Sequence, residues 1–130
     1  KNHPTLFIVG AGQSGTTWLQ ELLNYKKEYH LLFEPFHSHN NALLKDWNYQ
    51  QYIPSDCQES IYRSHKTDFI GEKSSVKAQE LKQNISAPQV LVKEIRMNLA
   101  LHWLKQQNPG LEIIFLLRHP QAVALSKMKL

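Results

Sequence analysis

The sequence is short of cysteine, of long apolar runs and of dense basic blocks, and each shortage excludes a class of protein. The single cysteine, Cys57, cannot form a disulfide within the chain and leaves no cysteine cluster for zinc. No apolar run approaches the length of about 20 residues that crosses a bilayer, and no signal peptide is visible. The absence of an uninterrupted lysine and arginine block disfavours an extended nucleic-acid surface.

The composition favours a globular domain with an anionic ligand. Of the 130 residues, 42% are hydrophobic, the formal net charge is +4 and the pI is about 9.2. This balance suits a basic pocket for a small polyanion, although nucleic acid is also anionic. The chain starts without methionine and stops inside an apparent helix, so we expect a fragment of a longer protein. The compartment stays open between cytoplasm and, if an upstream anchor exists, Golgi lumen.

Three apolar stretches are typical of buried strands. They are residues 5–10 (TLFIVG), 89–96 (QVLVKEIR) and 111–118 (LEIIFLLR), the last being the most strongly apolar. Because helical patterns separate these stretches, the fold class predicted is α/β, with a parallel sheet in three layers.

Helical spacing follows each predicted strand. After the first strand, an i, i+3, i+4 stripe is predicted to lie on the sheet, formed by Trp18, Leu19, Leu22 and Leu23. A second helix is predicted from residue 97 to the stop at Asn108-Pro109-Gly110. His119-Pro120 opens a third, with proline in the first turn. Residues 38–88 are polar and poorly periodic, and we interpret them as an insertion over the strand ends, with short helices around 40–48 and 73–84.

The stretch from Gly10 to Thr17 predicts a phosphate-binding loop. Gly10, Gly12 and Gly15 allow a tight turn, while Ser14, Thr16 and Thr17 add hydroxyl donors at the start of a helix, where the dipole favours an anion. The spacing also fits a nucleotide triphosphatase or a small-molecule kinase, and a plain strand–turn–helix remains an alternative.

Two residues argue against a triphosphatase. Thr16 stands where such a loop places its lysine, and the strand over 111–118 ends in Arg118 rather than a magnesium-binding aspartate. A cation at this position suits a second phosphate directly, so we expect a doubly phosphorylated ligand and no metal.

These residues resemble the sulfotransferase family. Ser14-Gly15-Thr16-Thr17-Trp18 is similar to the family's 5′-phosphosulfate loop, and Arg118-His119-Pro120 with Ser126 is similar to its 3′-phosphate motif. The resemblance implies a P-loop-like nucleotide-hydrolase topology in a single domain over 1–130, the N-terminal part of the enzyme. It also implies that 3′-phosphoadenosine 5′-phosphosulfate (PAPS) is the sulfuryl donor and that a hydroxyl compound is the acceptor. The donor-binding residues it implies are Gln13, Ser14, Gly15, Thr16, Thr17, Trp18, Arg118 and Ser126.

Two shorter stretches resemble the carbohydrate sulfotransferases. Phe33-Glu34-Pro35-Phe36-His37 is similar to their FEP segment, and Lys93-Glu94-Ile95-Arg96 to a basic strand end. The resemblance implies a sugar acceptor and Glu34 as catalytic base. We expect the apolar neighbours of Glu34 to raise its pKa. His37 is the competing base, and the alternatives for Glu34 are a surface glutamate or a structural partner of Lys93 or Arg96.

One position departs from the family pattern. Gln13 stands where the family usually carries a lysine or arginine that contacts the leaving phosphate. Lys93 or Arg96 could supply the missing charge, or the protein could be a non-catalytic nucleotide-binding relative. Trp18 and Trp103 could stack on adenine, but core packing is the expectation for both.

Overall fold

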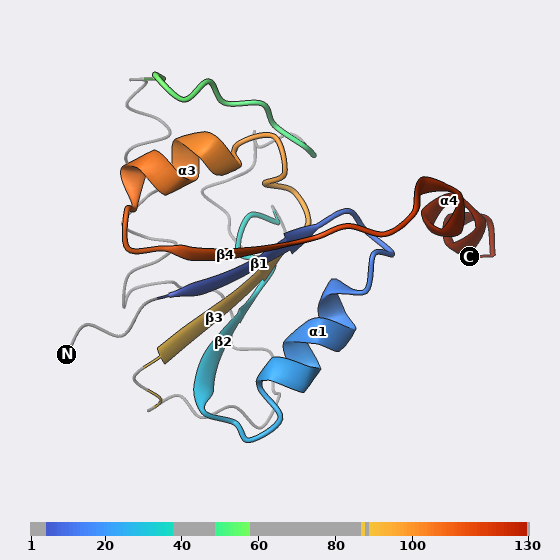
Figure 1. Ribbon diagram of the computed structural model, residues 1–130, viewed down its shortest axis with the longest axis horizontal. Helices are drawn as coiled ribbons and strands as arrows, with labels where there is room; N and C mark the ends of the chain where they lie inside the picture. Colours follow the sequence, from blue (N-terminus) through green and yellow to red (C-terminus); the bar gives the residue numbers. More distant parts are fainter. Residues whose placement is uncertain (1–4, 38–48, 58–86, 88, 130) are drawn as a thin grey trace.

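In the computed structural model, the described residues (5–37, 49–57, 87 and 89–129) form a parallel four-stranded sheet with helices on both faces (Figure 1). The strands are β1 (Leu6–Gly10), β2 (Tyr29–Phe33), β3 (Gln89–Glu94) and β4 (Glu112–Leu116), in the order β2-β3-β1-β4. The helices are α1 (Thr16–Leu23), α3 (Leu101–Gln107) and α4 (Pro120–Met128). The predicted α/β class and its parallel sheet are therefore confirmed.

The central strand β1 is buried on both faces, as its continuous apolar run predicted. Phe7, Ile8 and Val9 are fully buried. Successive side chains point to opposite faces, so Phe7 and Val9 join a core with Trp103 of α3, while Ile8 joins a second core against α1. Trp103 is thus a packing residue, as expected.

The two edge strands of the sheet, β2 and β4, differ from the sequence-based expectation in different ways. β2 was not predicted, and it pairs with β3 from Tyr29↔Gln89 to Phe33↔Lys93. β4 forms where expected but lies at the opposite edge, where Phe115 is half exposed. Its apolar sequence predicted a strand correctly and gave no information on its neighbours. Beyond it, α4 lies apart from the sheet (Figure 1) and has no buried residue.

The predicted orientation of α1 is wrong. Trp18 and Leu22 are 67% and 57% exposed, and the buried residues of the helix are Thr16 and Gln20. Of the predicted stripe, Leu19 packs against the core. Contacts at the two ends of the helix explain this orientation. At the first end, Thr16 lies against Gly10 of the phosphate loop. Just past the other end, the Asn24 side chain makes two hydrogen bonds to the backbone of Tyr29.

Two predicted elements cannot be compared with the structure. The short helices around 40–48 and 73–84 fall outside the described residues. Among the residues that are described, no helix combines the length and apolar character needed to cross a membrane.

Candidate active site

A pocket of about 390 Å³ opens where the carboxyl ends of the four strands meet. This edge is where ligands bind in open α/β sheets. The segment that follows each strand contributes to its wall, and the residues that line it are Gly12, Gln13, Gly15, Thr16, Thr17, Phe33, Glu34, Lys93, Ile95 and Arg118. Residues from both ends of the sequence therefore share one cavity.

The loop from β1 to α1 is closely packed at its base. A Cβ on Gly10 would lie 2.7 Å from the carbonyl oxygen of Leu116, so only glycine fits, and Gly15 adopts a left-handed φ of 98°. The Ser14 hydroxyl donates a hydrogen bond to the carbonyl of Ala11 at 2.5 Å. This bond closes the turn, so the Ser14 hydroxyl proton is directed into the loop rather than into the pocket. No side chain caps α1, which leaves its first turn of backbone amides for an anion.

Gln13 joins the two halves of the predicted donor site. Its carbonyl oxygen accepts a hydrogen bond from Nη1 of Arg118 at 2.9 Å, and its side-chain Oε1 accepts one from Oγ of Ser126 at 3.2 Å. These partners lie 105 and 113 residues along the chain. Gln13 has a left-handed φ of 68°, which is unfavourable for a residue with a side chain. The residue that departs from the family pattern therefore contacts both residues of the second motif.

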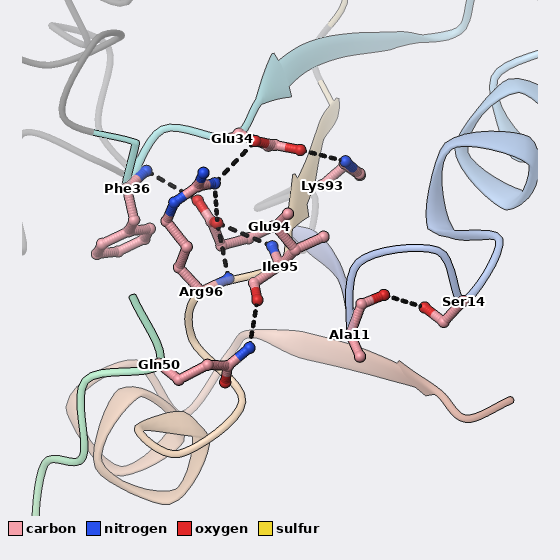
Figure 2. A network of polar contacts seen from close by, with 9 residues as sticks. All are labelled: Ala11, Ser14, Glu34, Phe36, Gln50, Lys93, Glu94, Ile95 and Arg96. Atoms are coloured by element: carbon pink, nitrogen blue, oxygen red, sulfur yellow. Dashed lines mark hydrogen bonds and ion pairs between the residues drawn. The ribbon is translucent and has the colours of Figure 1, made fainter. Parts of the chain in front are cut away.

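Glu34 lies at the pocket wall and forms ion pairs with both Lys93 and Arg96 (Figure 2). Its Oε1 lies 2.5 Å from Nζ of Lys93, and its Oε2 lies 2.8 Å from Nη1 of Arg96. Burial alone raises the pKa of Glu34, but the hydrogen bonds and charges of Lys93 and Arg96 outweigh it, so the pKa is lowered below 4.5. The expectation of a raised pKa is wrong, because Glu34 is paired with both Lys93 and Arg96.

Comparison with known proteins identifies the family. A family model described as "Sulfotransferase family" matches residues 4–130. The chain belongs to the sulfotransferase family. Neither the curated proteins nor the solved structures contain a significant match. Family membership supports sulfuryl transfer as the general activity, with a small-molecule donor and acceptor.

Four of the predicted site residues lie outside the lining of the pocket. Ser14 is buried, and its hydroxyl is bound within the loop. Trp18 points to solvent on α1. Ser126 lies on α4 and reaches the loop through its bond to Gln13. His37 closes the turn after β2, where its backbone amide donates to the carbonyl of Glu34 at 3.0 Å. The structure thus brings Glu34 and Lys93 to the pocket together with most of the loop.

Other residues shape the surroundings of this pocket and were not predicted from the sequence. Glu94 is fully buried beneath it, and a carboxylate at the end of a predicted buried strand was the available signal. Gln50 donates from Nε2 to the carbonyl of Ile95 at 2.7 Å, and the Tyr49 ring lies 5.7 Å from the Arg96 guanidinium. No sequence signal marked these two. Among the described residues, no group of acidic, histidine or cysteine side chains is placed to hold a metal ion.

Proposed function

We propose that this chain forms the donor and catalytic site of a PAPS-dependent sulfotransferase that acts on a carbohydrate hydroxyl. The observation that carries the proposal is the shared pocket, which the phosphate loop, Arg118 and the Glu34–Lys93 pair all line. Residues 1–130 act as one domain in this proposal, and residues 38–88 shape the acceptor side.

The donor side suits a ligand with two phosphate groups. The first-turn amides of α1 and the hydroxyls of Thr16 and Thr17 would hold the 5′-phosphosulfate. The Arg118 guanidinium has donors beyond the one bound to Gln13, and with Ser126 it would hold the 3′-phosphate. These contacts use amides, hydroxyls and a cation, so the proposal invokes no metal.

The transfer needs two things from the chain, which are stabilisation of the charge on the leaving phosphate and a base for the acceptor hydroxyl. The bond from sulfur to the donor's phosphate oxygen breaks with its electron pair on that oxygen, while a bond forms from sulfur to the acceptor oxygen. Lys93 and the loop amides would stabilise the charge that develops on the phosphate, an effect typically of about 3–4 kcal/mol for one well-placed donor. The acceptor's proton would pass to Glu34, which its lowered pKa keeps ionised at neutral pH. The second product is adenosine 3′,5′-bisphosphate.

The acceptor assignment is supported by the stretch around Glu34 and by an aromatic side chain at the rim. The OH of Tyr49 comes within 3.9 Å of where a Cβ on Gly12 would lie, and both Gly12 and Ile95 line the pocket. Tyr49 is half exposed, and an exposed aromatic face beside a catalytic pocket suits the apolar face of a sugar ring. His37 remains the second candidate for the base.

The direct test is calorimetric titration with adenosine 3′,5′-bisphosphate, compared with ADP plus magnesium. The proposal expects metal-independent binding of the bisphosphate that Arg118→Ala abolishes. The control is Lys127→Ala, which removes an exposed positive charge from α4 near Ser126 and should leave affinity unchanged. Preference for ADP with magnesium would replace this proposal with a kinase, and binding without PAPS turnover would indicate a non-catalytic relative.

A further inference from the structure

Glu94 is a second carboxylate near the pocket, and it does not reach the ligand space. It ends β3 beside Val9 of the central strand and is fully buried. Figure 2 shows its carboxylate accepting hydrogen bonds from three backbone amides. Oε2 accepts from the amide of Phe36 at 2.8 Å, while Oε1 accepts from Ile95 at 2.8 Å and Arg96 at 2.9 Å.

These hydrogen bonds join the segment after β2 to the segment after β3. Phe36 is 58 residues from Glu94, so its bond is a tertiary link. A second hydrogen bond joins the same two segments, because the Glu34 amide donates to the carbonyl of Lys93 at 2.7 Å. Glu34 is therefore held at its own amide and, two residues later, at Phe36. Glu34 also adopts a left-handed φ of 45°. A side-chain-bearing residue keeps such a conformation only where its surroundings hold it.

Arg96 connects the two carboxylates. Its Nη1 lies 2.8 Å from Oε2 of Glu34 and 3.7 Å from Oε1 of Glu94. Glu94 therefore acts on Glu34 by two routes, through the backbone at Phe36 and through the guanidinium.

Burying a carboxylate in this way is costly. Desolvation raises the pKa of Glu94, and the three amides and Arg96 only partly oppose it. Where stability is the only requirement, well-packed apolar residues usually serve as well as buried charges. A role in geometry accounts for this carboxylate better than a role in stability.

We propose that Glu94 is a positioning residue, which fixes residues 34–37 and Arg96 in one arrangement and thereby sets where the Glu34 carboxylate lies in the pocket. The catalytic part of this inference rests on the proposed function. The structural part, that one carboxylate holds two strand ends together, does not.

The test compares Glu94→Gln with Val92→Ala. Glutamine keeps the size of the side chain, but its NH2 group is a donor and cannot accept a hydrogen bond. At least one of the three backbone N–H groups would therefore face another donor. Val92 is equally buried in the same strand but belongs to the apolar core, so its variant reports general destabilisation. Two readouts are needed: backbone hydrogen exchange over residues 34–37 and 95–96, and PAPS turnover alongside affinity for adenosine 3′,5′-bisphosphate.

The proposal expects Glu94→Gln to lose exchange protection in those two segments while β1 keeps it. Turnover should fall by up to about 10²-fold, as displaced catalytic groups typically cause, with bisphosphate affinity unchanged. Val92→Ala should lower protection across the sheet and alter affinity and turnover together. Full protection of residues 34–37 in Glu94→Gln, or equal losses of affinity and turnover, would overturn the proposal.

The inference can still be refuted if the variant does not fold or if the proposed function is wrong. If Glu94→Gln does not fold, the Phe36 amide of the unmodified protein decides, because free exchange there would contradict the link. If the unmodified protein binds no bisphosphate, the proposed function fails, while the exchange data still test the structural part.

Discussion

Replacing Glu34 by glutamine tests both the ion pair and its place in the pocket. The change keeps the side chain's size and removes its negative charge, which leaves Lys93 and Arg96 without their shared partner. The side chains are almost buried, with 4% of Lys93, 12% of Glu34 and 16% of Arg96 exposed. Solvent therefore screens the unpaired cations poorly.

The expected cost follows from the burial and from the partners that remain. Removing one member of a buried ion pair typically costs about 3–5 kcal/mol. Lys93 still lies 4.4 Å from the centre of the Phe33 ring, and Arg96 still lies 3.7 Å from Glu94. Contacts of this kind recover about 1–2 kcal/mol, so Glu34→Gln should lower the free energy of unfolding by about 1–4 kcal/mol.

The loss should depend on pH in a defined direction. Because the folded state lowers the pKa of Glu34, its carboxylate stabilises the fold above the ordinary value of 4.5. This contribution is lost as the pH falls through the lower folded value. The stability difference between the unmodified protein and Glu34→Gln should therefore be full at neutral pH and shrink below pH 4.5.

Ligand affinity should move in the opposite direction from turnover. Without Glu34 the pocket carries one more net positive charge, so adenosine 3′,5′-bisphosphate should bind more tightly. Turnover of PAPS should fall by about 10²–10⁴-fold, the usual contribution of a general base.

Urea unfolding and calorimetry measure these effects, with Glu112→Gln as the control. Glu112 is exposed at the start of β4, at the opposite end of the sheet from the pocket. In a double-mutant cycle with Lys93→Met, the two changes together should cost less than their sum. A cost below about 1 kcal/mol, as for surface pairs, combined with an additive cycle would refute the reasoning.

Two other substitutions test the loop. Gly10→Ala places a Cβ 2.7 Å from the carbonyl of Leu116 and should destabilise the fold by about 1–3 kcal/mol in urea unfolding. Its control, Gly110→Ala, meets nothing within 4 Å and should be nearly neutral, so equal effects would contradict this account. Gln13→Lys restores the cation typical of the family and should raise PAPS turnover, by up to about 10²-fold if the ammonium reaches the leaving phosphate. An unchanged turnover would indicate that Lys93 already fills that role.

The parts of this fold that sequence predicted well are those fixed by local physics. The run of Phe7, Ile8 and Val9 is apolar without interruption, and the glycines after it allow few structures other than a tight turn. The stop at Asn108 and the start at Pro120 likewise depend on neighbouring residues alone.

The parts predicted poorly depend on contacts between distant residues. β2 begins with Tyr29 and His30, so its apolar run is too short to distinguish from a loop. The face of α1 that lies on the sheet is determined by contacts at the two ends of the helix rather than by its apolar stripe. The pKa of Glu34 was expected to rise because its sequence neighbours are apolar, whereas the cations that lower it lie 59 and 62 residues away.

The charge that Gln13 lacks is therefore present in the pocket, but it is shared. Lys93 lines the same cavity and forms an ion pair with Glu34. A donor phosphate that attracts Lys93 must compete with Glu34, and a Glu34 freed from Lys93 regains proton affinity, because that contact is one cause of its lowered pKa. Donor binding and base strength would then be coupled through one ammonium group. Glu34→Gln removes the base and at the same time releases Lys93 from its carboxylate. Gln13→Lys adds an independent cation and leaves the Glu34–Lys93 pair in place, so the two substitutions together separate the leaving-group charge from the base.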